Sequence, residues 1–420
     1  MFKKFILLLL LVAGVKAHQH ADWCILLYMD GMQDLEGPCF KNITEIIRGV
    51  QNDNVQIFVQ LHAEMEKKVA HRYRVEPNKL VFDSYVDMAF DMVQDLADSA
   101  QWAFSQCKAH HNGVILWDHG FGILDPQWQE NDEGKMDWLA EADEPIGRRL
   151  RFVHPQSSEH VKLRHKGILF NNAAQYYMTN DQMVAAFAKI YTILGGKKLD
   201  ILGTDTCGMS MLEIGWQLRD YVEHLVGAQN CEELDGWPYK AIFETMSSDI
   251  YSPKQVCQII TDEYNSYHIK KAQKGVYTKA ALDLSHMEEV KQSLDEIVVE
   301  LQKEISKEKL KKIVYDARSN CTKFCINPLY TDLWTLYEEI GKNLDSDGLL
   351  STNLNNKLND GKKAIEVAVV ANATGKLMQR AHGISVYMPF HHIDSSYKET
   401  MFAHDSQWLS FMEYLLSPIS

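Results

Sequence analysis

Residues 199–208 read LDILGTDTCG, and this stretch decides the fold. Its first half is a short apolar run from Leu199 to Leu202, which is typical of a strand buried on both faces of a parallel sheet. A short polar segment that ends in Cys207 follows directly. Open parallel sheets bind their ligands beyond the carboxyl ends of the strands. The stretch therefore predicts an α/β protein that presents Cys207 at this edge of its sheet.

A second stretch repeats this arrangement upstream. Residues 113–120 read GVILWDHG, so His119 and Gly120 also follow an apolar strand. A nucleophilic thiol needs a partner for proton transfer and surroundings that favour the thiolate, to which a helix beginning after Cys207 would contribute. Cys207 and His119 form such a pair if both strands lie in one sheet. The backbone N–H groups of Gly120 and Cys207 are candidates to bind a developing oxyanion.

Strands and helices alternate through the first half of the chain. Apolar runs predict further strands at 23–29, 55–61 and 224–229. Helical spacing predicts helices at 85–107, 179–194 and 209–221. The second of these opens with a capping box from Thr179 to Gln182. This alternation predicts a mostly parallel sheet flanked by helices.

The second half of the chain is different. Leu294 to Val314 carries apolar residues at helical spacing, and short strands are expected at 279–284 and 383–388. We therefore divide the chain into a catalytic domain over 18–250 and a largely helical C-terminal region over 251–420. The strands of the second region are available to rejoin the first sheet.

The first 17 residues have the pattern of a signal peptide. Lys3 and Lys4 precede an apolar stretch from Phe5 to Val15 that is short for a membrane span, and cleavage is expected after Ala17. An uncleaved anchor is the alternative. No later stretch has 18 uninterrupted apolar residues, so we expect no stable membrane span and a secreted, periplasmic or cell-surface protein. A formal net charge of -14 disfavours nucleic acid as a partner.

Cofactor and metal signals are weak in this sequence. The 8 cysteines are irregularly spaced, and the single close pair, Cys321 and Cys325, reads as a disulfide or as two ordinary buried thiols. The 17 histidines include adjacent pairs but no HExxH motif, and neighbours on a strand point to opposite faces. Calcium remains possible in principle, although no contiguous acidic loop supports it. We expect no metal site and no required cofactor.

Several motifs in order resemble the clostripain family of cysteine peptidases, which are relatives of caspases, gingipains and legumains. The resemblance begins at WCILLYMDGMQDLE, includes VILWDHGFG, and is strongest over LDILGTDTCGMSMLEIGWQLRDYVEHLVGAQNCEELDGWPY. It resumes at YTKAALDLSHMEEV, YTDLWTLYEEI and HGISVYMPF. It implies a caspase-like fold and endopeptidase activity, with Cys207 as nucleophile and His119 as the proton donor to the leaving amine. The resemblance implies no third member of a catalytic triad, so Asp118 is a candidate bystander.

The resemblance also implies a preference for Arg or Lys before the scissile bond, in protein or peptide substrates. A cationic side chain needs a carboxylate in its pocket, and Asp205 and Asp235 occupy the matching positions. The structural alternative for Asp205 is a turn residue that caps the next helix.

A polar segment between about 125 and 175 separates His119 from Cys207, and it is long for a loop in a compact domain. The resemblance implies a zymogen that cuts itself in this interval; the alternative is a solvated insertion. Seven basic residues are candidate processing sites: Lys135, Arg148, Arg149, Arg151, Lys162, Arg164 and Lys166.

Other classes of protein fit the sequence less well. A catalytically inert caspase-like binding protein is the main alternative, although both members of the dyad are present. A metal-dependent hydrolase lacks a supporting motif, and a serine hydrolase lacks G-x-S-x-G.

Overall fold

The computed structural model describes residues 20–31, 35–63, 69–87, 91–124, 128–130, 136–138, 168–171, 176–271 and 275–418. The signal peptide predicted over 1–17 and all seven candidate processing residues lie outside these ranges. In the described part of the chain, no helix combines the length and the apolar character needed to cross a membrane.

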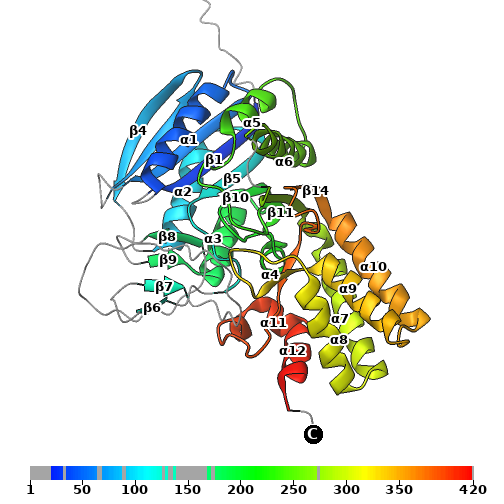
Figure 1. Ribbon diagram of the computed structural model, residues 1–420. Helices are drawn as coiled ribbons and strands as arrows, with labels where there is room; N and C mark the ends of the chain where they lie inside the picture. Colours follow the sequence, from blue (N-terminus) through cyan, green and yellow to red (C-terminus); the bar gives the residue numbers. More distant parts are fainter. Residues whose placement is uncertain are drawn as a thin grey trace, which may run out of the picture.

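A nine-stranded sheet forms the centre of the molecule, in the order β14-β12-β11-β10-β5-β1-β2-β3-β4 (Figure 1). Its five central strands run parallel: β1 (Ala21–Gly31), β2 (Val55–Ala63), β5 (Ala109–Trp117), β10 (Leu199–Asp205) and β11 (Val222–Gly227). The predicted α/β fold with a mostly parallel sheet is confirmed.

The strands at both sides of the sheet are antiparallel to their neighbours: β3 (Val69–Glu76), β4 (Lys79–Asp87), β12 (Thr278–Asp283) and β14 (Val369–Thr374). The last two follow residue 250 and still belong to the central sheet. The helix predicted from residue 85 was wrong at its start, because Tyr85 lies in β4. Helix α2 begins at Met92, where the Asp91 side chain accepts a hydrogen bond from the Gln94 N–H.

Helices cover both faces of the sheet. One face carries α1 (Glu36–Gly49), α5 (Tyr239–Met246) and α6 (Pro253–Lys270), and the other carries α2 (Met92–Gln106), α3 (Asn180–Ile193) and α4 (Leu212–Leu218). Successive residues of β1 enter the two cores in turn: Ile25 packs into the first and Leu26 into the second. Burial on both faces explains the continuous apolar runs. The capping box at Thr179 is present as predicted.

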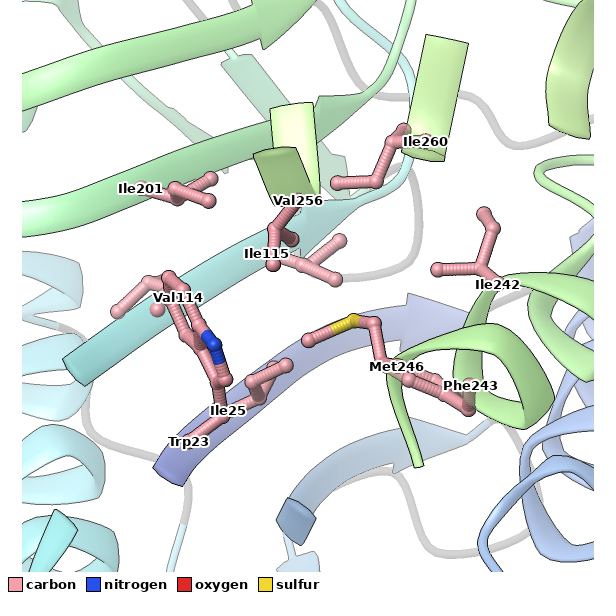
Figure 2. A pocket seen from close by; sticks show the side chains of 11 residues that line it. Trp23, Ile25, Val114, Ile115, Ile201, Ile242, Phe243, Met246, Val256 and Ile260 are labelled. Carbon is pink, nitrogen blue, oxygen red and sulfur yellow. The ribbon is translucent and has the colours of Figure 1, made fainter. Parts of the chain in front are cut away.

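The core on the first face contains a small apolar cavity (Figure 2). Its lining comes from β1, β5, β10, α5 and α6, and includes Ile25, Ile115 and Met246. None of the predicted site residues lines this cavity, so it belongs to the packing of the core.

The C-terminal helices lie together below the sheet in the view of Figure 1 (yellow-green to red), next to α4 and β14. They are α7 (Met287–Glu304), α8 (Lys307–Asn320), α9 (Leu333–Ser346), α10 (Thr352–Ala368), α11 (Met401–Asp405) and α12 (Trp408–Leu416), with 3-10 turns at Leu284–His286 and Tyr397–Glu399. The helix predicted over 294–314 is two helices, because the chain leaves helical geometry at Ile305. Their buried residues continue the core of the second face without interruption.

Three short two-stranded sheets complete the described fold. They are formed by β6 (Trp128–Glu130) with β7 (Met136–Trp138), β8 (Ile168–Asn171) with β9 (Tyr176–Met178), and β13 (Tyr330–Asp332) with β15 (Ser385–Tyr387). The strand predicted at 383–388 is therefore β15, which lies outside the central sheet.

Candidate active site

The turns that carry His119 and Cys207 leave the sheet side by side. Strands β5 and β10 are adjacent and parallel, and Trp117 pairs in register with Asp205. Each turn begins immediately after one of these two residues. The structure therefore brings the two segments together at the carboxyl edge of the sheet, where the sequence placed them.

The two turns approach each other closely at Gly120. A Cβ atom at this position would lie 2.6 Å from the Cys207 carbonyl oxygen and 2.7 Å from Thr206 Oγ1. Contacts this short leave no room for a side chain, so glycine is required here. The backbone on the other side is held by β8, because the His119 carbonyl accepts a hydrogen bond from the Leu169 N–H at 3.2 Å.

Cys207 lies in a turn, and the expectation that it opens a helix was wrong. Helix α4 begins only at Leu212, so its N-terminus does not start at the thiol. The turn is stabilised by Gly208, which has a φ of +68° and donates its N–H to the Asn230 carbonyl at 3.0 Å. The backbone needs a left-handed residue here, which favours glycine after Cys207.

The Cys207 sulfur receives a backbone hydrogen bond that the sequence did not reveal. The N–H of Glu232 points at Cys207 Sγ with a distance of 3.1 Å, and the thiol is half-buried. This donor is placed to interact with negative charge that develops on the sulfur. A backbone group has no side-chain signature, so only the position of Glu232 after β11 could have suggested this contact.

Asp205 is buried beneath the loop that contains Asp235. Its Oδ2 atom accepts hydrogen bonds from the Trp237 N–H at 3.0 Å and from the Tyr239 hydroxyl at 2.8 Å. Burial raises its pKa to about 6, although Lys279 and these hydrogen bonds oppose the rise. In the described part of the chain, its other oxygen has no hydrogen-bond partner. Asp205 thus fixes the loop and keeps one acceptor atom unused.

A buried ion pair lies next to Asp205. Lys279 of β12 contacts Glu232 at 2.8 Å, and their side chains are 0% and 6% exposed. The Lys279 ammonium also lies over the rings of Trp237 and Tyr264, at 4.6 and 4.5 Å from their centroids. Burial raises the pKa of Glu232 to about 7, and Lys279 limits this rise. One ammonium therefore balances two buried carboxyl groups.

Asp235 has a different environment from Asp205. Its side chain is 29% exposed, and Lys41 and Lys271 both form ion pairs with it. Partial burial would raise its pKa, but the hydrogen bonds from the two lysines lower it to about 2. Only Gly236 separates Asp235 from Trp237, so the structure brings both predicted acids to one loop, with their carboxylates directed at different partners.

Metal ligands do not gather among the described residues: no three His, Cys, Asp or Glu side chains are arranged there to hold an ion. His111 of the adjacent histidine pair contacts Asp200 at 2.8 Å and packs on Trp23.

Both predictions for the pair Cys321 and Cys325 were wrong. The two cysteines do not form a disulfide, because both are free thiols. They are not two buried thiols either, because Cys321 is buried and Cys325 is exposed.

Comparisons with known proteins agree with this architecture. Residues 163–415 match the model of the clostripain family of C11 peptidases; this range includes Cys207 and both acids and begins after His119. The comparison with curated proteins finds no match.

Two solved structures are similar to this chain over more than nine-tenths of its length. One is a secreted C11 cysteine protease from Bacteroides thetaiotaomicron in complex with an irreversible peptide inhibitor, at 16% identity, a TM-score of 0.64, and coverage of 93% of this chain and 100% of that chain. The other is an inactive zymogen C11 protease from Parabacteroides distasonis, at 14% identity, a TM-score of 0.59, and coverage of 92% and 98%. The chain belongs to the clostripain family and is a cysteine-type peptidase with a caspase-like fold.

Proposed function

We propose that this protein is a secreted endopeptidase that uses a dyad of Cys207 and His119 to cut peptide bonds after Arg or Lys. The observation that carries the proposal is the contact between the two turns at Gly120, where a Cβ atom would lie 2.6 Å from the Cys207 carbonyl oxygen. Two strands that end in register bring the turns of His119 and Cys207 side by side, and this supports a dyad that acts by covalent catalysis.

In the proposed mechanism, the Cys207 thiolate attacks the carbonyl carbon of the scissile bond. The N–H groups of Gly120 and Cys207 stabilise the oxyanion that forms. His119 then protonates the leaving amine, and water hydrolyses the thioester to release the acid product. The Glu232 N–H, which donates to Cys207 Sγ at 3.1 Å, orients the sulfur for attack. We propose that no cofactor is required.

The proposed basic preference rests on two acids: Asp235, in the loop that contains Gly236, and Asp205, which lies beneath this loop at the end of β10. Asp235 is partly exposed and already binds two lysine ammonium groups, so a substrate cation would replace one of them. Asp205 adds negative charge beneath the loop and has one oxygen without a partner in the described structure. Both features support a pocket for Arg or Lys.

We further propose export through the signal peptide at 1–17 and self-processing between His119 and Cys207. The relatives in solved structures include a protease described as secreted and one described as an inactive zymogen. To test processing, the purified protein is incubated and its fragments are measured by intact mass. We expect a new N-terminus after Lys or Arg between 125 and 176, and a Cys207→Ala sample that stays in one piece. A wild-type chain that is fully active yet intact would refute processing.

A positional-scanning peptide assay tests the function itself. Wild type should cut after Arg or Lys, whereas Cys207→Ala should be folded and inactive, and His119→Ala nearly inactive. Retained turnover by Cys207→Ala would contradict the assignment of Cys207 as the nucleophile of the dyad. Absence of turnover together with failure of wild type to react with a thiol-directed peptidyl probe would instead favour an inert binding protein.

A further inference from the structure

Three cysteines gather at the edge of the candidate active site. Cys207 lies in the turn after β10, Cys231 in the loop after β11, and Cys325 in the loop that joins α8 to β13. All are free thiols; Cys207 and Cys231 are half-buried, whereas Cys325 is exposed. Neither Cys231 nor Cys325 has a role in the proposed peptidase mechanism.

The neighbours of Cys231 tie it to both other cysteines. On one side, Asn230 Oδ1 accepts hydrogen bonds from the Cys325 N–H at 2.7 Å and from the Cys325 thiol at 3.0 Å. On the other side, the Glu232 N–H donates to Cys207 Sγ at 3.1 Å. Cys231 therefore lies between a residue bound to Cys325 and a residue bound to Cys207.

A packing contact places the Cys325 loop on the Cys207 turn by an independent route. A Cβ atom on Gly208 would lie 3.1 Å from the Ile326 side chain. Gly208 follows Cys207 and Ile326 follows Cys325, so the two segments touch next to both sulfurs. The three thiols are held together by backbone structure and by side-chain contacts.

The two additional thiols differ in reactivity. A hydrogen bond from the Cys231 side chain lowers the pKa of Cys325 to about 7. Interactions with the sulfurs of Cys207 and Cys325, together with burial, raise the pKa of Cys231. Cys325 therefore supplies an exposed thiolate near neutral pH, while Cys231 remains a protonated neighbour.

We propose that Cys325 and Cys231 form a thiol-modification site that closes to a disulfide and lowers the activity of the peptidase. With oxidised glutathione as the oxidant, the Cys325 thiolate attacks one sulfur and releases one glutathione thiolate. Cys231 then loses its proton to that thiolate or to solvent, attacks the sulfur of Cys325, and releases the second glutathione. Two protein thiols are oxidised, and one glutathione disulfide is reduced to two thiols.

Closure of this disulfide affects the nucleophile through the residues around it. Cys231 loses the S–H group that interacts with the Cys207 sulfur. The adjacent Glu232 N–H, which also donates to Cys207 Sγ, is moved as the loop is drawn toward Cys325. Loss of a hydrogen bond to a charged group costs roughly tenfold in an equilibrium or a rate, and we expect a loss of activity of that size. The loss of activity rests on the proposed role of Cys207 as nucleophile, whereas formation of the disulfide does not.

The disulfide can be tested without any peptidase activity. Full-length Cys207→Ala protein is treated with oxidised glutathione, blocked with iodoacetamide, digested and mapped by mass spectrometry. We expect one cross-linked peptide that joins Cys231 to Cys325. Cys325→Ser in the same background should lose it, whereas Cys321→Ser, at a buried thiol at the start of the same loop, should keep it. Absence of the cross-link in Cys207→Ala protein would overturn the site, whatever Cys207 does.

The effect on activity is measured on protein that contains Cys207. Wild type should lose activity in oxidised glutathione and recover it in a thiol reductant, whereas Cys325→Ser should keep most of its activity. An equal loss in both proteins, or a disulfide between Cys207 and Cys231 as the main product, would show that oxidation acts on Cys207 itself and would overturn the inference. If the cross-link forms but reduced wild type has no peptidase activity, the proposed function is contradicted, while the disulfide site of Cys231 and Cys325 is supported.

Discussion

Two charged clusters near Gly236 differ in their exposure to water: one is buried and the other is exposed. In the buried cluster, Asp205 and Glu232 share Lys279, and desolvation raises the pKa values of the carboxyl groups to about 6 and about 7. In the exposed cluster, Asp235 is paired with two lysines and its pKa falls to about 2. The pKa of a carboxyl group is therefore raised or lowered according to the access of that group to water and to cations.

The difference assigns separate tasks to the two clusters. A buried ion pair is costly to break, because removal of one partner leaves the other charge without compensation. An exposed pair contributes little to stability and exchanges readily, which suits a position where a substrate cation has to enter. We therefore expect the exposed cluster to contact the substrate cation directly, and the buried cluster to support the loop and to add negative charge beneath it.

The largest expected effect is on stability, from removal of the buried cation. Lys279→Met should lower the free energy of unfolding by about 3–5 kcal/mol at pH 8, because Asp205 and Glu232 are then buried without a cation. The loss should be smaller at pH 5.5, where both carboxyl groups can be protonated. Urea unfolding of Cys207→Ala protein, which avoids self-digestion, measures the change. Lys271→Met is the control and should cost less than about 1 kcal/mol; equal losses would remove the distinction between the clusters.

The second effect is the dependence of stability on pH. The folded protein retains protons on Asp205 and Glu232 up to pH values of about 6 and about 7, whereas the unfolded chain releases them near their ordinary values. The free energy of unfolding should therefore fall as pH rises from about 4 to about 7, by on the order of 3 kcal/mol for Asp205. Urea unfolding across this range in Cys207→Ala protein, with and without Asp205→Asn, checks the sign; an unchanged slope in the Asn variant would contradict it.

Asp235 should act in the opposite direction and at lower pH. Its pKa of about 2 lies below the ordinary value, so its contribution is present above about pH 4 and is lost as pH falls toward 2.

The third effect is on substrate choice. Asp235→Asn should reduce the preference for Arg over norleucine by roughly 10–100-fold in kcat/KM, because a charge-assisted hydrogen bond to the substrate is lost. The folded structure should be retained, since the residue is partly exposed. Matched fluorogenic peptides provide the measurement. If only Asp205→Asn changes the preference, the substrate cation binds in the buried cluster, and the two roles are reversed.

The smallest effect concerns competition within the exposed cluster. Lys41→Met removes one cation from Asp235, and kcat/KM for an Arg peptide should rise by a few-fold, while that for a norleucine peptide should not change. Lys240→Met, at another exposed ion pair, serves as the matched control. Lower activity on the Arg peptide would mean that Lys41 supports the pocket and does not compete for it.

The sequence was sufficient for the central strands and for the approach of the two turns that carry His119 and Cys207. Buried parallel strands are continuous apolar runs, and adjacent strands bring their carboxyl ends to one edge, so local patterns carried this information. The family resemblance added Asp205 and Asp235, which spacing alone would not have separated from turn residues.

Other features depend on contacts between distant residues and left no local pattern. Lys279 pairs with Glu232 across 47 positions, and each residue by itself resembles an ordinary surface charge. The β3–β4 hairpin was not predicted. Phe82 and Tyr85 lie on its exposed face, and apolar residues three positions apart are also the spacing expected of a helix. The helix expected from residue 209 begins only at Leu212, because apolar residues such as Met209 and Met211 before it resemble a first helical turn.

The position of β5 between β1 and β10 would affect the lifetime of the enzyme if it is processed as proposed. A cut after His119 and before Cys207 would divide the central sheet between two polypeptides that are joined by backbone hydrogen bonds and shared cores. Such a pair does not dissociate while it is folded, but once unfolded its two parts must find each other by diffusion. Reassembly then becomes second order in concentration, so a dilute protease outside the cell would lose activity permanently at each unfolding event. Its working life would be set by the unfolding rate alone.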